Sequence, residues 1–141
     1  MGVQFKQLAD GSLGLEGIAR DAGAFLFVPV VYSANATSAS VFTAPRACVV
    51  QGISGRVEIA GTGGACTFSL FKAVSGVAGA SGVLLHTGSF NVAGTAATSQ
   101  TLVLSTVLNA LAMNAGDSIY VALTGTPTSA IGNLTIALNP A

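Results

Sequence analysis

The sequence is poor in charged residues. Only 7% of its 141 residues are Asp, Glu, Lys or Arg, and the formal net charge is zero, whereas an ordinary soluble domain is about 25% charged. Neither hydrated ions nor repulsion between like charges would keep copies of such a chain apart, so a free monomer is prone to associate. We therefore expect neighbouring subunits to cover much of its surface.

Basic residues are too few and too scattered for a phosphate-binding surface. The chain holds five, none adjacent to another: Lys6, Arg20, Arg46, Arg56 and Lys72. Nucleic-acid binding needs several Lys or Arg on one face. The sequence therefore predicts no nucleic-acid partner.

Long apolar runs are also missing. The densest run, residues 24–32, is too short to cross a bilayer as a helix and contains Pro29. The segment before it carries Asp10, Glu16 and Asp21, where a secretory signal would be positively charged. We expect no membrane partner and synthesis in the cytoplasm.

Residues that carry catalysis or bind metals are scarce. His86 is the only histidine, and the two cysteines, Cys48 and Cys66, lack the spacing of metal ligands. No nucleophile elbow or phosphate-binding loop is present. We expect no catalytic residue, metal or cofactor, and hence no enzyme. His86 is predicted to be an ordinary strand residue, and both cysteines are predicted to be buried, unpaired apolar side chains.

What the chain has in quantity is alternation of apolar and small or polar residues. Residues 111–125 (LAMNAGDSIYVALTG) predict a strand, a tight turn and a second strand whose Ile119, Val121 and Leu123 share one face. Leu134 and Ile136 repeat the pattern in the closing strand. The turn residue Asp117 is expected to bind nearby backbone N–H groups.

Three further expectations concern the strands between these segments. Pro29 places residues 25–31 at a sheet edge or at a bulge, because proline cannot donate a ladder hydrogen bond. Val57 and Ile59 are expected to point inward, with Arg56 and Glu58 outward. GTGG at residues 61–64 is expected to turn the chain back into a hairpin with residues 65–72.

Eight or nine short strands, turn signals every 8–12 residues and no helical period predict an all-β fold. A jelly-roll sandwich or barrel of about eight short antiparallel strands over residues 25–141 fits best. Residues 1–24 hold five of the ten charged residues and show no sustained period. They predict an extended N-terminal arm, which packs either on its own barrel or on a partner.

Three segments together carry a family resemblance: RACVVQGISGRVEIAG at residues 46–61, residues 111–125, and IGNLTI at residues 131–136. They resemble the jelly-roll decoration (cement) proteins of tailed bacteriophage heads, most closely those of short-tailed phages. The resemblance implies a non-enzymatic virion protein on the outer surface of an icosahedral capsid. There it would bridge neighbouring major-capsid subunits and stabilise the expanded shell.

This interpretation assigns contacts to the arm and to the first strand. Capsid contacts are expected at Phe5, Lys6, Leu8 and Arg20. Contacts between copies, in a dimer rather than a trimer, are expected at Phe25, Phe27 and Tyr32. The alternative is a trimeric receptor-binding or tail-fibre tip module, which shares the β-rich, Gly- and Thr-rich composition.

Overall fold

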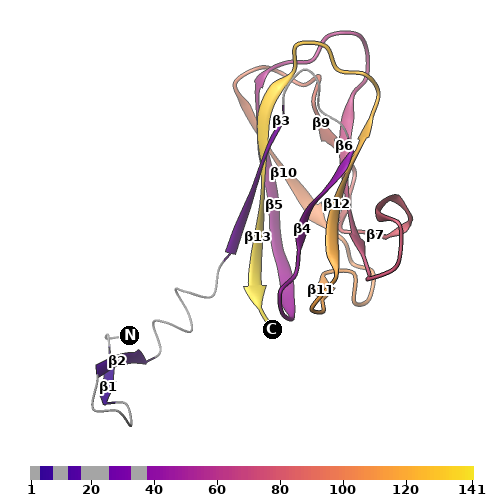
Figure 1. The fold of residues 1–141 in the computed structure, drawn as a ribbon. Helices are drawn as coiled ribbons and strands as arrows, with labels where there is room; N and C mark the ends of the chain where they lie inside the picture. The colour runs from indigo at the N-terminus through magenta and orange to yellow at the C-terminus, as the bar shows by residue number, and fades with distance from the viewer. Residues whose placement is uncertain (1–3, 8–12, 17–25, 33–37) are drawn as a thin grey trace.

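Two antiparallel β-sheets face each other in the computed structural model, which describes residues 4–7, 13–16, 26–32 and 38–141 (Figure 1). The first sheet has the order β3 (Leu26–Tyr32), β13 (Ile131–Pro140), β5 (Cys48–Ile59), β10 (Thr98–Leu104) and β8 (His86–Thr87), with β11 (Ala112–Met113) also paired to β5. The second has the order β4 (Ala39–Thr43), β12 (Ser118–Thr124), β6 (Thr67–Ala73) and β7 (Val83–Leu84), with β9 (Phe90–Asn91) also paired to β6.

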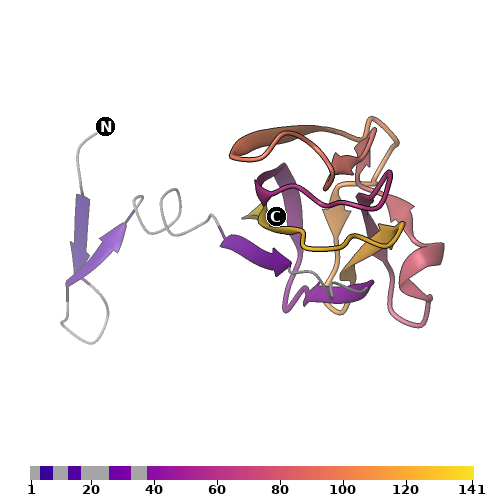
Figure 2. The same ribbon diagram turned by 90° about the horizontal axis from the view of Figure 1, so that it is seen from above.

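The strand order is that of a jelly roll. The first and last long strands, β3 and β13, are neighbours, and β5 and β10 follow them in the same sheet, while the intervening strands form the facing sheet. Seen from above, the two sheets form separate layers, and the 3-10 turn η1 (Gly79–Ser81) lies outside the second layer (Figure 2). This arrangement confirms the predicted all-β sandwich.

The core lies between the layers and is built by the alternating residues. Leu134 and Ile136 of β13 and Ile119 of β12 are fully buried, as their period of two predicts. An aromatic cluster forms one end of it, where the Tyr32 ring meets Phe68 at 5.1 Å and Phe90 at 6.1 Å, both edge to face. Such pairs add to the stabilisation from buried area.

The predicted hairpin at residues 61–64 is wrong in its pairing. Gly63 and Gly64 have φ of 104° and 116°, a conformation that favours glycine, so the turn itself is confirmed. However, β5 and β6 belong to different sheets. The turn therefore carries the chain from one layer to the other.

The predicted inward orientation of Ile59 is also wrong, because its side chain is exposed. The register between β5 and β13 shifts between Ile131 and Gly132, so Ile59 lies opposite the exposed Ile131. Val57, before the shift, is buried as predicted. A register shift of this kind breaks the alternation that sequence analysis relies on.

Residues within the predicted N-terminal arm form a hairpin. Strand β1 (Gln4–Gln7) pairs antiparallel with β2 (Leu13–Glu16), with Gln4 opposite Glu16 and Gln7 opposite Leu13. Among the described residues these strands form a sheet of their own. Sequence analysis did not predict this pairing.

No helix in the described part of the chain is long and apolar enough to cross a membrane.

Candidate interaction surface

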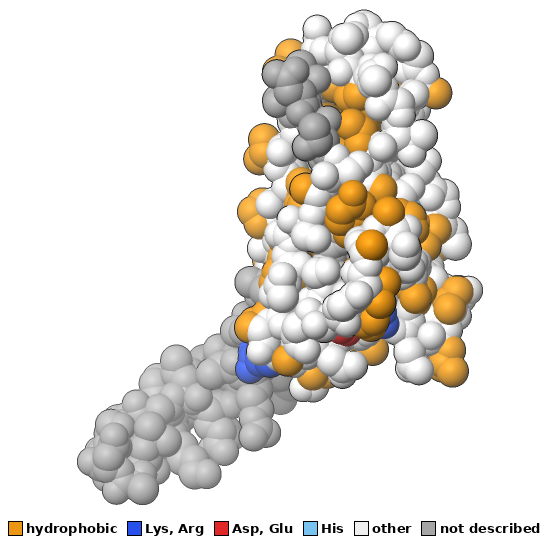
Figure 3. Space-filling view, turned by 45° about the vertical axis from the view of Figure 1, so that its right-hand side comes forward, with side chains coloured by type: hydrophobic (Ala, Val, Ile, Leu, Met, Phe, Trp, Pro, Cys, Tyr) orange, Lys and Arg blue, Asp and Glu red, His pale blue; other side chains and the backbone are white. Residues whose placement is uncertain are grey.

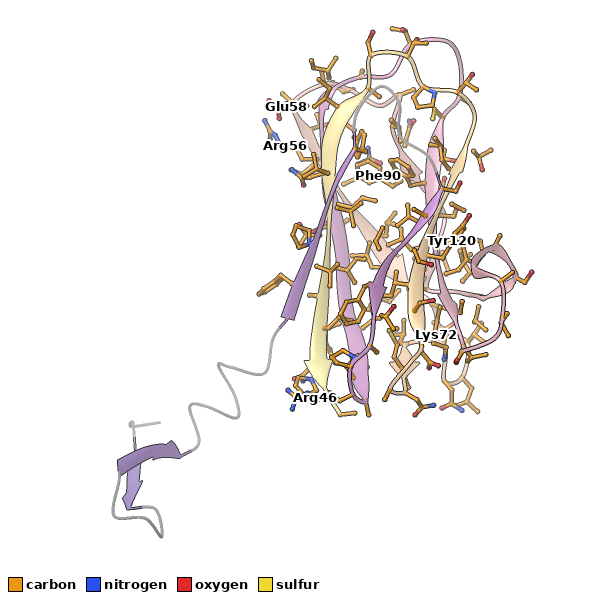
Figure 4. The ribbon with its side chains drawn as sticks, in the orientation of Figure 1. Arg46, Arg56, Glu58, Lys72, Phe90 and Tyr120 are labelled. Carbon is orange, nitrogen blue, oxygen red and sulfur yellow. The ribbon has the colours of Figure 1, made fainter. Side chains whose placement is uncertain are left out.

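The described surface of the sandwich is nearly free of unpaired charge. Arg56 and Glu58, both outward on β5 as predicted, form an exposed ion pair with an Nε–Oε2 distance of 2.8 Å. Lys72 and Asp117 are buried. Within residues 38–141, Arg46 is the one charged residue that is exposed without an ion-pair partner, and it lies at the opposite end of the sandwich from the Arg56–Glu58 pair (Figure 4).

Figure 3 shows the consequence on one face of the molecule. Almost every described side chain there is hydrophobic or uncharged, and blue and red atoms are confined to one end. A surface of this kind costs little to desolvate, because few ions lose their hydration when a partner covers it. This face of the sandwich therefore has the low charge that the sequence analysis expects of a surface covered by neighbouring subunits.

Lys72 is a buried cation that sequence analysis missed. Its ammonium donates hydrogen bonds to the carbonyl oxygens of Asn109 and Ala112, at 2.5 and 2.8 Å. It shares the inward face of β6 with Phe68 and Leu70, so its place in the alternation was the signal that could have revealed it. The lysine holds the loop of residues 105–111 against the sandwich.

That loop presents apolar side chains to solvent. Leu108 is 87% exposed and Val107 is 61% exposed. Beside them lies an open groove of about 360 Å³, lined by residues 105–109 with Val49, Leu111 and Ala112. The two exposed aliphatic side chains and the adjoining groove make this end a candidate interaction surface.

Strand β3 forms an edge of the first sheet, which is one of the two positions that Pro29 predicted. Its outward face carries Phe27, 59% exposed, and Val31, 80% exposed, with the exposed Pro29 between them. Opposite them in the register lie Ala137, Thr135 and Asn133 of β13. This apolar row is a second candidate interaction surface.

The predicted contact residue Tyr32 lies in the core instead. Its side chain is 3% exposed, because alternation along β3 turns it toward the facing sheet. Burial raises the pKa of its hydroxyl to about 12, and the nearby Cys66 acts in the same direction. Tyr32 therefore presents no surface to a second copy, and its predicted role between copies is corrected.

The remaining predicted contacts lie in the N-terminal segment. Phe5 and Lys6 fall on β1. Leu8, Arg20 and Phe25 lie outside the described residues. The structure thus leaves the four predicted capsid contacts as predictions.

A third apolar area covers the outer face of the second sheet. Tyr120 of β12 lies opposite Phe71 of β6, and Phe71 lies opposite Leu84 of β7. A side chain added at Gly79 would collide with the Tyr120 ring, so η1 packs directly on it. The segment around η1 thereby covers part of this face, as Figure 4 shows beside Tyr120.

The described residues contain no cluster of three potential metal ligands. Both cysteines are free and buried, as predicted, and burial raises the pKa of each thiol, so neither is activated as a nucleophile. Asp117 accepts a hydrogen bond from the backbone N–H of Asn114 at 2.8 Å, which confirms its role in the turn. His86 is buried in β8, where its Nε2 accepts the Leu70 N–H at 2.9 Å.

Comparison with protein-family models gives no match, and no curated protein matches the sequence. Among solved structures, a chain from the capsid of Ralstonia phage GP4 superposes with a TM-score of 0.54 at 16% identity, covering 83% of both chains. A chain from the Cyanophage Pam1 capsid asymmetric unit gives 0.49 at 18% identity, covering 83% of this chain and 84% of that one. A chain from Bacillus endospore appendages gives 0.38 at 16% identity, covering 83% and 88%. At these identities the GP4 likeness establishes a shared all-β fold.

Proposed function

We propose that this chain is a non-enzymatic structural protein of a phage virion, bound to the outer surface of an icosahedral head. The observation that carries the proposal is the sandwich surface, on which Arg46 is the single described charge that is exposed and unpaired. Permanent coverage by neighbouring subunits suits such a surface. A fold shared with a chain of the GP4 capsid supports the same assignment.

In its capsid role the protein cements neighbouring major-capsid subunits. A protein that binds the expanded shell, and not separated or unexpanded subunits, stabilises that shell by its binding free energy. At a free concentration 100 times the Kd this amounts to about 2.7 kcal/mol per site. Repetition over many equivalent sites multiplies the effect.

The hairpin β1–β2 is assigned to the capsid. A two-stranded sheet without a second layer is marginally stable in water, and in the described chain β1 and β2 pair only with each other. Docking on a capsid subunit supplies the missing layer. Phe5 and Lys6 lie on β1, and together with the predicted contacts Leu8 and Arg20 of residues 1–24 they stay assigned to the capsid.

The edge strand β3 is assigned to contacts between copies, in a dimer. Its exposed Phe27 and Val31 supply apolar area. Pro29 limits direct strand addition, because it offers no N–H at the middle of the edge. Packing of the outward side chains therefore contributes more than a continuous backbone ladder.

The test is co-sedimentation of the purified protein with phage heads. The protein should pellet with empty expanded heads, should not pellet with unexpanded ones, and should raise the temperature at which expanded heads break. The alternative, a receptor-binding or tail-fibre tip module, would be a trimer in isolation and would adsorb to host cells. Adsorption to cells without binding to heads would overturn the capsid assignment.

A further inference from the structure

His86 lies where the chain passes from one sheet to the other. Strand β7 pairs with β6, the next strand, β8, pairs with β10 in the opposite sheet, and β9 pairs with β6 again. Between Leu84 and Phe90, therefore, the chain that pairs with β6 leaves this strand and crosses to the other sheet. Gly88, with φ of 74°, allows the turn that returns the chain.

This detour interrupts the hydrogen bonds of β6 at Leu70. The Leu70 carbonyl still accepts the N–H of Leu85 at 2.9 Å. Its own N–H, however, is bound by His86 Nε2, also at 2.9 Å. The imidazole therefore replaces the backbone carbonyl that a continuous strand would supply, and a buried N–H that would cost free energy if left alone is satisfied.

The hydrogen bond fixes the protonation state of the ring. Since Nε2 accepts, it carries no proton, and in a neutral imidazole the proton lies on Nδ1. Nδ1 is 3.4 Å from the Thr87 carbonyl oxygen, which is placed to accept it. The side chain is 1% exposed, so a cation formed there would be almost wholly without water.

We propose that His86 is an acid-operated latch, in which protonation of Nε2 removes the acceptor of the Leu70 N–H and releases the crossing segment from β6. The proton comes from bulk solvent. Once bound, it sets an N–H of the ring against the N–H of Leu70, so the bond is lost and a charge is buried at the same time. Opening of the crossing lets water reach the imidazolium.

The electrostatic surroundings agree with this mechanism. Burial lowers the pKa of His86, and its hydrogen bonds with the backbone of Thr87 and Gly88 offset that only in part. Five other titratable groups are buried among the described residues. They are Cys48 on β5, Cys66 directly before β6, Tyr32 on β3, Lys72 on β6 and Asp117 directly before β12. Both thiols and the phenol have raised pKa values and stay neutral in weak acid.

The sign of the effect follows from linkage. The folded pKa of His86 lies below its unfolded value of about 6.5, so between the two values the unfolded chain binds one more proton than the folded chain. Folding is therefore favoured at high pH, and the unfolding equilibrium constant rises about tenfold for each pH unit lost within this window. Below the folded pKa this dependence ends.

The test uses untagged isolated protein, because a histidine tag would add imidazoles. Unfolding in urea is measured from pH 8 to pH 5 for the wild type, His86→Gln and His86→Leu. Gln keeps an acceptor near the Nε2 position but does not titrate, so its unfolding constant should lack the wild-type rise in acid. Leu removes both properties and should be destabilised at every pH without that rise. A rise of equal size in all three proteins would overturn the proposal.

A second measurement needs no variant. The single histidine gives one pair of imidazole ¹⁵N resonances, which should report the Nδ1–H tautomer at pH 8 and a midpoint below 6.5. The hydrogen-exchange protection of the Leu70 amide should fall with the same midpoint. An Nε2–H tautomer, or unchanged Leu70 protection across the midpoint, would refute the latch. Neither experiment involves phage heads, so failure here leaves the capsid assignment standing.

Discussion

The sandwich buries a core of its own, whereas the described hairpin β1–β2 has two four-residue strands and no second layer. The two regions also differ in how many charged residues they hold. Residues 1–24 hold five of the ten charged residues, and from residue 26 onward two of the other five are buried and two pair with each other. Stability thus lies in one region and ionic character in the other.

This division indicates two kinds of contact in the proposed assembly. A nearly ion-free sandwich can be covered by neighbours at little desolvation cost, while a charged hairpin of marginal stability gains from a partner that completes it. The first contact depends on apolar area and shape. The second depends on charge and on a conformation fixed by binding, and changes in each region should have separable effects.

Phe90→Ala should have the largest effect on the sandwich. The ring is fully buried and packs edge to face on Tyr32, and truncating a buried Phe costs about 3–5 kcal/mol. Urea unfolding followed by circular dichroism measures the loss. Val103→Ala, at an exposed site of β10, is the control and should change stability by less than about 0.5 kcal/mol. Equal effects at both positions would contradict the assigned core.

Deletion of residues 1–24 should leave the sandwich intact and weaken head binding. The unfolding midpoint should change little, because β1 and β2 pair with no strand of the sandwich. Loss of a second, linked contact should raise the Kd for expanded heads about 100-fold. A chain in which residues 1–24 are replaced by a Gly/Ser segment of equal length separates loss of contacts from loss of length. Unchanged occupancy of heads would refute the role of this segment.

Sequence analysis predicted those features of the fold that follow from a period of two. Leu134, Ile136 and Ile119 lie in the core as the pattern required, and β3 lies at a sheet edge, one of the two positions that Pro29 predicted. The pattern failed at Ile59, where a register shift turns the side chain outward. Periodicity describes a regular ladder, so it cannot show where the ladder shifts.

The candidate surfaces were harder to predict, because they depend on contacts distant in sequence. Whether residues 61–64 close a hairpin or cross between sheets is decided by the partners of β5 and β6, which local residues do not encode. Lys72 was considered only as one of five scattered basic residues, although its place after Phe68 and Leu70 puts it on the inward face. Its acceptors, Asn109 and Ala112, lie 37 and 40 residues away.

Lys72→Met tests whether the buried lysine organises the loop of residues 105–111. Two charge-assisted hydrogen bonds are lost, while the desolvation penalty of the ammonium also disappears. We expect a net loss of about 1–3 kcal/mol in unfolding free energy. Hydrogen exchange in the loop should accelerate more than exchange in β13. An unchanged loop would show that its conformation does not need the lysine.

Val31→Lys tests the contact assigned to β3. An exposed lysine on an edge strand opposes association between copies, because its charge must be desolvated in the interface. We expect the dimer Kd to rise about tenfold, or about 1.4 kcal/mol, with the monomer stability unchanged, as measured by sedimentation equilibrium. Val103→Lys, on the same sheet but away from the β3 edge, is the matched control. If the dimer Kd rises equally for both variants, the contact between copies lies elsewhere.

Arg56→Ala should have the smallest effect of all. The Arg56–Glu58 pair is solvent-exposed, with side chains 45% and 57% accessible, and exposed pairs contribute less than about 1 kcal/mol. Since the two charges neutralise each other, removing one leaves a net negative site, whereas the double variant Arg56→Ala/Glu58→Ala leaves none. Binding to expanded heads should therefore fall more for the single variant than for the double if this face is covered in the capsid. Isothermal titration at two salt concentrations measures the difference, and equal affinities for both variants would place this face in solvent.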